Sequence, residues 1–270
     1  MPRTTDDLRS LRKQQAKELY EQGYDSAQIG ELLDVHQFTV RRWLHDQDVK
    51  VMSASARTKA RNRKYIHNPN LFATFAPYTA YYAGWLMADG NVSTAANMVQ
   101  IEIHRRDRQF LVGLKKALGY TGPISARTRV SASGTKSKMV ALRVCDAAQL
   151  ITDLAVWGVV PRKSRRSAVG RKVGIHGLQE FYFRGLFEGD GSVGRRKSKP
   201  YYSFLTVAGS PAVVDAFRDW CWQEVREVGS LNRRTDLTHV VTFGAKNAEL
   251  VHKRLYRSKE CPRLNRKAKL

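Results

Sequence analysis

Apolar and polar positions follow the same order twice along the chain from residue 77 onward. Each copy opens with an almost wholly apolar stretch, which predicts a buried helix that ends at Asp-Gly. The first stretch is YAGWLMADGNV at residues 82–92, and the second is FRGLFEGDGSV at residues 183–193. The segments after each stretch predict the order helix, two strands, helix, two strands, helix. Because Asp89 and Asp190 lie 101 residues apart, we interpret the two halves as a duplication.

The alternation within the predicted strands indicates which side chains face away from the helices. In the segment NMVQIEIH, Val99, Ile101 and Ile103 share the apolar face, and the residues between them share the polar face. The candidates for the polar face of the first half are Gln100, His104, Arg127, Arg129 and Arg143. The candidates in the second half are Arg195, Lys197, Arg233 and Arg234. The alternation of GSLNRRT is ambiguous, so the register of the second half stays open.

Three shorter helical segments precede this duplication. The second of them begins after Gly23, where Asp25 or Ser26 can cap it. A tight turn at Asp34 and Val35 separates it from the third. The residues expected to face inward are Leu8, Leu11, Ala16, Leu19 and Tyr20, then Ile29, Leu32 and Leu33, and finally Val40, Trp43 and Leu44.

This arrangement predicts a helix-turn-helix unit over residues 1–46, and its spacing resembles the helix-turn-helix domains of resolvases and transposases. The last helix of such a unit contacts base edges and phosphates in the major groove. The candidate DNA-binding residues on its outward face are Gln37, Thr39, Arg41 and Arg42. A small helical bundle with an incidental basic face is the alternative interpretation.

A basic segment joins this unit to the duplication. Residues 47–75 show little apolar periodicity, so we expect a linker there. Its candidate DNA-binding residues, Arg61 and Arg63, either follow phosphates or a minor groove or are simply solvated. The expected domains are therefore 1–46, 47–75, 76–170 and 171–270.

The charge of the chain narrows the range of partners. Its 270 residues include 47 Lys and Arg against 24 Asp and Glu, a net charge of +23. Because basic residues occur along the whole sequence, we expect nucleic acid as the polyanionic partner. An anionic membrane surface and a solubility device are the alternatives. With 42% hydrophobic residues, the chain can bury a core.

Cysteine usage and hydropathy indicate an intracellular protein. The three cysteines, Cys145, Cys221 and Cys261, fit neither a disulfide framework nor a CxxC metal site, which favours reduced thiols used in packing. The chain shows no apolar secretion signal and no apolar run of membrane-spanning length. We therefore expect a cytoplasmic or nucleoid-associated protein without membrane contact.

The two apolar stretches, with their spacing and strand order, resemble the LAGLIDADG motif of homing endonucleases. The resemblance extends from about Pro77 to Lys267, and the N-terminal unit lies outside the family's core fold. It implies an α+β fold, namely a duplicated αββαββα core with pseudo-two-fold symmetry plus a small all-α helix-turn-helix domain. The two apolar helices would form the junction between the halves, and the sheets would form a saddle over a DNA duplex.

Small residues make such a close junction physically reasonable. The small-residue strip is formed by Ala83, Gly84 and Ala88 in the first helix and by Gly185 and Gly189 in the second. Close contact would bring Asp89 and Asp190 side by side, where two carboxylates repel each other unless cations lie between them. Oxygen ligands and a phosphate substrate favour Mg²⁺, which retains several waters. The resemblance implies a metal site at Asp89 and Asp190 with the adjoining Ala88 and Gly189.

The resemblance also implies a catalytic lysine near the end of each repeat that supports the active-site waters. Lys163 follows Asp89 by 74 residues, and Lys267 follows Asp190 by 77 residues. That these are ordinary surface lysines of a basic chain is the alternative. The sixth motif position is Met87 in one copy and Glu188 in the other.

The function implied by the resemblance is sequence-specific, Mg²⁺-dependent cleavage of double-stranded DNA by a monomer of the intron-encoded homing type. Such an enzyme hydrolyses phosphodiester bonds in both strands of a long site. We expect an asymmetric site, because the two halves of the chain differ. A catalytically inactive helix-turn-helix regulator with the same fold and an RNA maturase are the alternatives.

Overall fold

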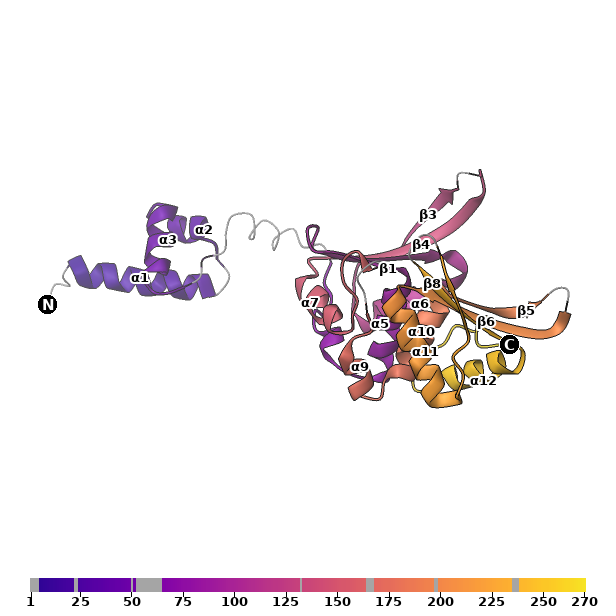
Figure 1. The fold of residues 1–270 in the computed structure, drawn as a ribbon. Coiled ribbons are helices and arrows are strands. Elements are labelled where there is room, and N and C mark those ends of the chain that lie inside the picture. Colours follow the sequence, from indigo (N-terminus) through magenta and orange to yellow (C-terminus); the bar gives the residue numbers. More distant parts are fainter. Residues whose placement is uncertain are drawn as a thin grey trace. The chain divides into compact units, whose positions relative to one another are not determined.

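The computed structural model divides the chain into two compact units, Met1–Lys64 and Tyr65–Leu270 (Figure 1). The described residues are 5–21, 24–49, 51, 65–131, 133–163, 168–196, 199–234 and 238–270. The candidate DNA-binding residues Arg61, Arg63 and Lys197 lie outside the described residues. We call the two units unit 1 and unit 2.

In its described part, unit 1 forms three helices, α1 (Thr5–Glu21), α2 (Ser26–Leu32) and α3 (Gln37–His45). Asp25 caps α2, because its Oδ1 accepts a hydrogen bond from the Gln28 backbone N at 3.0 Å. Gln28 Oε1 accepts in return from the Asp25 backbone N at 2.9 Å. This reciprocal pair is a capping box, so the expected start of the second helix is confirmed.

A small apolar cluster holds these helices together. Its buried members are Ala16, Ile29, Val40, Trp43 and Leu44. Two inward assignments are wrong, because the side chain of Leu11 is 43% exposed and that of Leu32 is 60% exposed. Ile29 and Leu33 are four residues apart and share the inward face of α2, which turns Leu32 toward solvent.

Unit 2 contains two copies of the predicted helix and strand order. The first copy is α5 (Pro77–Asp89), β1 (Gly90–Ser93), β2 (Met98–His104), α6 (Arg108–Ala117), β3 (Ser125–Val130), β4 (Lys136–Cys145) and α7 (Ala148–Val156). The second copy is α10 (Gln179–Asp190), β5 (Gly191–Arg196), β6 (Lys199–Gly209), α11 (Pro211–Val225), β7 (Ser230–Arg233), β8 (His239–Gly244) and α12 (Ala245–Leu255). Short helices η1 (Leu71–Ala73), η2 (Arg105–Asp107) and α9 (Arg171–Ile175) complete the described elements.

The eight described strands form two antiparallel sheets of the same order, β1-β2-β4-β3 and β5-β6-β8-β7. The helices of unit 2 lie on one side of the sheets, and the β3–β4 and β5–β6 hairpins extend beyond the helical body (Figure 1). The predicted α+β fold with a duplicated αββαββα core is therefore confirmed.

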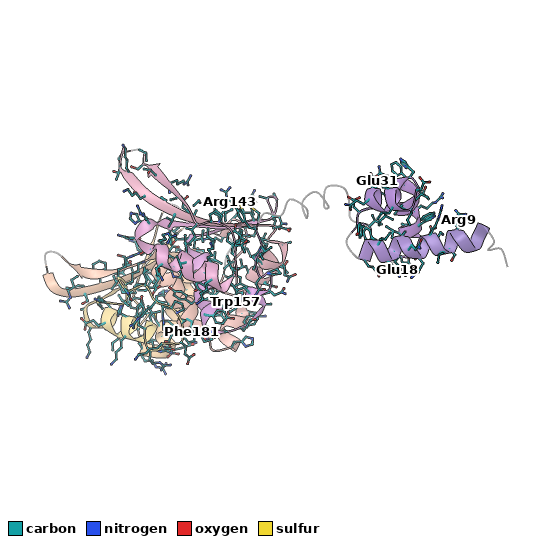
Figure 2. The ribbon with its side chains drawn as sticks, turned by 180° about the vertical axis from the view of Figure 1, so that it is seen from behind. Arg9, Glu18, Glu31, Arg143, Trp157 and Phe181 are labelled. Atoms are coloured by element: carbon teal, nitrogen blue, oxygen red, sulfur yellow. The ribbon has the colours of Figure 1, made fainter. Side chains whose placement is uncertain are left out.

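The linker predicted at residues 47–75 extends too far at its C-terminal end, because unit 2 begins at Tyr65. Leu71 and Phe72 are buried in unit 2, although both fall within the linker expected at residues 47–75. Trp157, which lies within the body of unit 2 (Figure 2), donates from Nε1 to the backbone oxygen of Phe72 at 2.8 Å. Apolar contacts at two positions are enough to fix this segment, and they are too few to produce a periodic pattern.

Helices α5 and α10 pack against each other through the predicted small-residue strip. A Cβ on Gly84 would lie 2.0 Å from the backbone oxygen of Tyr182, and one on Gly185 would lie 2.1 Å from that of Tyr81. These separations are far below van der Waals contact, so only glycine permits the backbones to approach this closely. The large apolar neighbours Trp85, Leu86, Met87, Leu186 and Phe187 are buried in the core as expected.

The remaining packing features concern thiols and hydropathy. Cys221 and Cys261 are buried, as expected for thiols used in packing, whereas Cys145 is exposed. Among the described residues, no helix has the length and apolar character needed to cross a membrane.

Candidate active site

Two carboxylates lie at the adjoining C-terminal ends of α5 and α10. Asp89 is the last residue of α5, and Asp190 is the last residue of α10. Asp89 Oδ2 lies 3.4 Å from the position that a Cβ on Gly189 would occupy, next to Asp190 in the chain. The close packing of the two helices thus brings the two acids to one place, as the motif predicted.

The surroundings of these acids disfavour their negative charges. Asp89 and Asp190 both keep solvent-exposed surface. The protein atoms around Asp89 still displace water from its carboxylate, and this partial burial raises its pKa. The charge of Asp190 also raises the pKa of Asp89, Lys163 and Lys267 lower it, and the net result is a pKa of about 6. Burial likewise raises the pKa of Asp190, and the same two lysines lower it. Such a pair is stabilised by added positive charge.

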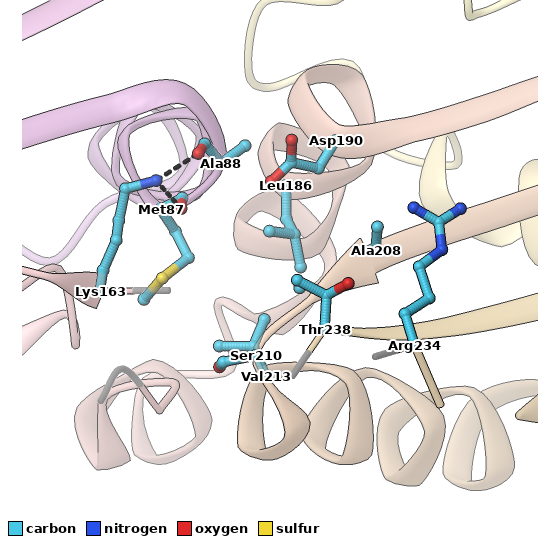
Figure 3. A pocket seen from close by; sticks show the side chains of 11 residues that line it. Met87, Ala88, Lys163, Leu186, Asp190, Ala208, Ser210, Val213, Arg234 and Thr238 are labelled. Carbon is cyan, nitrogen blue, oxygen red and sulfur yellow. Dashed lines mark hydrogen bonds between the residues drawn. The ribbon is translucent and has the colours of Figure 1, made fainter. Parts of the chain in front are cut away.

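Lys163 and Lys267 bind equivalent backbone positions beside the two acids. Lys163 Nζ donates to the carbonyl oxygen of Met87 at 2.6 Å and also to that of Ala88 (Figure 3). Lys267 Nζ donates to the carbonyl oxygens of Glu188 at 2.7 Å and Gly189 at 3.3 Å. The acceptors correspond under the 101-residue shift, so the two lysines occupy matching places in the duplicated fold.

Burial of these lysines alters their protonation. Burial lowers the pKa of Lys163, and the nearby Asp190 and Asp89 oppose that change. Burial and the neighbouring Arg266 guanidinium lower the pKa of Lys267 to about 8, against the opposing effect of nearby acids. Because both ammonium groups are enclosed by backbone carbonyls, neither behaves as the ordinary surface lysine that was the alternative.

A hollow opens beside Asp190 and Lys163 (Figure 3). Arg234 and Thr238 line it from the β7–β8 connection, and Ser210 lines it from the start of α11. Arg234 was a candidate for the polar sheet face without a determined register. The structure brings it to the same hollow as one of the two acids.

The polar face of the first sheet holds all of its candidate residues. The pairing β2 with β4 sets Gln100 opposite Arg143, and Arg143 Nε donates to Gln100 Oε1 at 2.9 Å. By the same registers, His104, Arg127 and Arg129 share that face. Arg127 Nη2 donates to Glu102 Oε1 at 2.8 Å. Figure 2 shows Arg143 at the level of the sheets, and Arg127, Arg129 and Arg143 are exposed.

Two candidates in the second sheet lie on the opposite face from the one expected. Arg195 pairs with the buried Ser203, and Arg233 pairs with His239. Both partners share the face of the buried Leu205, Phe243 and Val241. These strands lack the continuous apolar alternation that would reveal their register, so the sequence left the register open and named the two arginines only as candidates. The residues that sequence reasoning missed form one row across the polar face, Ser192, Thr206, Thr242 and Ser230.

Helix α3, the third helix of unit 1, exposes only one of its four candidate DNA-binding residues fully. Arg42 is exposed, whereas Gln37, Thr39 and Arg41 are half-buried. Arg41 donates from Nε to Ser26 Oγ at 3.2 Å and from Nη2 to Gln37 Oε1 at 3.5 Å. Sequence reasoning missed Phe38, whose side chain is 64% exposed. A lone aromatic among polar residues is a weak signal, because it fits a core position equally well.

A buried acid also joins the two halves. Glu188 accepts hydrogen bonds from the Tyr81 hydroxyl at 2.5 Å and from Trp85 Nε1 at 3.3 Å, both on α5. It also accepts from the Tyr256 hydroxyl at 2.9 Å and from the Leu264 backbone N at 2.8 Å. Glu188, which stands where the first copy has Met87, therefore connects α10 to α5 and to the C-terminal segment through hydrogen bonds.

The donor set at the two acids suits a hard divalent cation. Mg²⁺ binds through one or two carboxylates and retains several waters, so a large cluster of acids is unnecessary. Within the described ranges, no group of three or more His, Cys, Asp or Glu side chains is arranged to hold a metal. Asp89, Asp190 and the carbonyl oxygens of Ala88 and Gly189 offer oxygen atoms alone, which fits Mg²⁺ and disfavours softer metals.

Comparison with known proteins supports this architecture. Residues 12–50 match a family described as "Putative ATPase subunit of terminase (gpP-like)". The homing endonuclease I-WcaI, solved bound to its DNA recognition sequence, is similar with a TM-score of 0.54 and 11% identity, over 82% of this chain and 96% of that chain. Unit 2 therefore has the LAGLIDADG endonuclease fold. A search of curated proteins found no match.

Two further solved structures show weaker likeness. The LAGLIDADG meganuclease I-AabMI, bound to uncleaved DNA, matches with a TM-score of 0.44 and 14% identity, over 72% of this chain and 87% of that chain. The N-terminal LAGLIDADG domain of DUF199/WhiA matches with a TM-score of 0.43 and 14% identity, over 69% of this chain and 79% of that chain.

Proposed function

We propose that the chain is a monomeric, Mg²⁺-dependent endonuclease that cuts both strands of DNA at a long, asymmetric site. The observation that carries this proposal is the pair Asp89 and Asp190 at the ends of two close-packed helices, with Lys163 and Lys267 on the preceding carbonyls. The regulator alternative is disfavoured, since a protein that only binds DNA needs neither acid.

The residues of the site have distinct roles in this proposal. Asp89, Asp190 and the carbonyl oxygens of Ala88 and Gly189 would hold Mg²⁺. When bound, Mg²⁺ supplies a more acidic water and stabilises negative charge on the leaving 3′ oxygen. Lys163 and Lys267 hold these carbonyl groups in place by hydrogen bonds and would add positive charge where the scissile phosphates lie. The polar face of the first sheet offers exposed arginines to the duplex.

A cleavage experiment tests the proposal directly. The protein is incubated with a random duplex library in Mg²⁺ or in EDTA, and all new DNA ends are sequenced. We expect paired ends at one sequence class in Mg²⁺ alone. Specific binding without new ends under any divalent ion would establish the regulator function instead.

Replacing Lys163 by methionine separates chemistry from binding. We expect the cleavage rate of bound DNA to fall about a hundredfold, because a positioned charge in an active site contributes on that order, while affinity changes little. Lys136→Met is the matched control, since Lys136 is exposed on the extended β3–β4 hairpin. That variant should bind more weakly and retain the single-turnover rate. Equal single-turnover rates for the two variants would contradict the role of Lys163.

The distribution of charge predicts which part of the chain supplies the salt-dependent affinity. Residues 1–49 contain seven Lys and Arg against nine Asp and Glu, whereas residues 50–270 contain 40 against 15. Removing residues 1–49 should therefore weaken specific binding while the salt slope changes by no more than about 2, the value for two phosphate contacts. The rate of cleavage once bound should persist. A much larger change of slope in filter-binding titrations would refute this assignment.

A further inference from the structure

An exposed aromatic side chain marks the first turn of α3. Phe38 is 64% exposed, although Val40, Trp43 and Leu44 of the same helix are buried. Its neighbours on the outward side of α3 include Arg41 and Arg42. A single exposed apolar side chain is common on protein surfaces. Phe38 is distinguished by its place beside two arginines on the outward side of α3.

The ring of Phe38 is held in place. It stacks on His36, with ring centroids 5.2 Å apart and an interplanar angle of 25°. The Arg41 guanidinium carbon lies 5.4 Å from the ring centroid, and Arg41 is itself anchored to Ser26 on α2. The Phe38 backbone N also donates to His36 Nδ1 at 3.4 Å. A ring held by contacts with two neighbouring side chains loses little conformational freedom on binding, which suits a recognition contact.

The charge of unit 1 indicates what kind of contact this is. With seven basic residues against nine acidic ones in residues 1–49, phosphate attraction cannot be the main contribution of these helices. Helix α1 carries four basic and four acidic residues, and α2 carries one acidic residue. Helix α3, with Arg41, Arg42 and no acidic residue, is therefore the one of the three with a net positive charge. This helix can therefore approach a duplex, while its selectivity has to come from contacts other than charge.

We propose that Phe38 reads the 5-methyl group of thymine in the major groove and so determines sequence specificity in unit 1. The methyl group of thymine is the apolar feature that a base pair displays in that groove, and phenylalanine is among the side chains that contact it. His36 and Arg41 act as positioning residues that hold the ring. The inference rests on the proposed DNA-binding function and does not require catalysis.

The test replaces thymine by uracil, which removes the methyl group and leaves the Watson–Crick edge unchanged. A tight-binding duplex is first selected with the full chain in EDTA, and each thymine is then replaced in turn. At one or two positions we expect affinity to fall roughly fourfold, the effect of one buried methyl group. Phe38→Ala should abolish this difference between thymine and uracil. The ratio of the affinities for the thymine and uracil duplexes should stay constant as the salt concentration rises, because an apolar contact is not screened, although both affinities fall.

Leu32→Ala is the matched control, because Leu32 is an exposed apolar residue of the same unit on α2. It should keep the thymine-to-uracil difference. The proposal is overturned if uracil is tolerated at every position, if Phe38→Ala weakens thymine and uracil duplexes equally, or if no specific duplex is selected. A clear methyl effect in a protein that never cuts would sustain this inference and refute the nuclease function alone.

Discussion

Replacement of Asp89 or Asp190 by asparagine will abolish DNA cleavage while leaving DNA binding largely intact. The amide has the same shape as the carboxylate and lacks the negative charge that would hold Mg²⁺ between the two helix ends. We expect the single-turnover rate to fall by about a thousandfold or more, equivalent to roughly 4 kcal/mol. Full cleavage by either variant would rule out this active site.

The same substitutions have a predictable effect on folding. Burial raises the pKa values of both acids above their ordinary range, and the charge of Asp190 adds to the rise at Asp89, so the ionised forms destabilise the folded state near neutral pH. Asparagine should therefore preserve or raise the melting temperature, and loss of cleavage cannot be attributed to unfolding. Asp219→Asn, an exposed position on α11, is the matched control and should alter neither property.

Gly84→Ala and Gly185→Ala will each disrupt the junction between the two halves. The new methyl group would lie about 2 Å from a backbone carbonyl oxygen of the facing helix, so the helices must separate. We expect each variant to lower the free energy of unfolding by about 2–3 kcal/mol. This corresponds to a decrease of roughly 5–10 °C in the melting temperature of unit 2. In folded protein, cleavage should fall about a hundredfold, because the two acids move apart.

A glycine in a different helix provides the control for this prediction. A Cβ on Gly174 of α9 would meet the flexible end of the Gln179 side chain at 3.3 Å, which can move aside. Gly174→Ala should therefore change the free energy of unfolding by less than about 1 kcal/mol. The intrinsic preference of alanine for helices acts in the stabilising direction. Calorimetry should therefore show a lower melting temperature for Gly84→Ala and almost no change for Gly174→Ala, although both replace glycine by alanine. Equal melting temperatures for Gly84→Ala and the parent would disprove the close-packing argument.

The duplicated fold was predictable because several local signals agree. Two apolar helices that end in Asp-Gly, each followed by alternating strands, require a repeated αββαββα order, and the 101-residue period aligns Asp89 with Asp190. The glycines of the strip have no role in a solvent-exposed helix, so their positions indicated a helix–helix contact. The positions of Lys163 and Lys267 followed from the family resemblance, and the structure adds the carbonyl oxygens that they bind.

Features that depend on pairing between distant segments could not be predicted. The faces of Arg195 and Arg233 depend on which residues of β6 and β8 lie opposite them, and a shift of one residue would reverse both assignments. The role of Glu188 depends on Tyr81 and Tyr256, which are far from it in sequence. The sequence pattern around Phe38 fits a core position as well as a surface position, and its exposure is seen only in the structure.

Whether Asp89 and Asp190 hold divalent cations is measured by locating those ions in the protein bound to its selected duplex. Crystals of that complex are soaked in Mn²⁺, which replaces Mg²⁺ and gives an anomalous signal. We expect anomalous peaks in contact with the carboxylates of Asp89 and Asp190, and no such peaks in the double asparagine variant. Peaks confined to other places, in crystals whose DNA is nevertheless cut, would contradict this expectation.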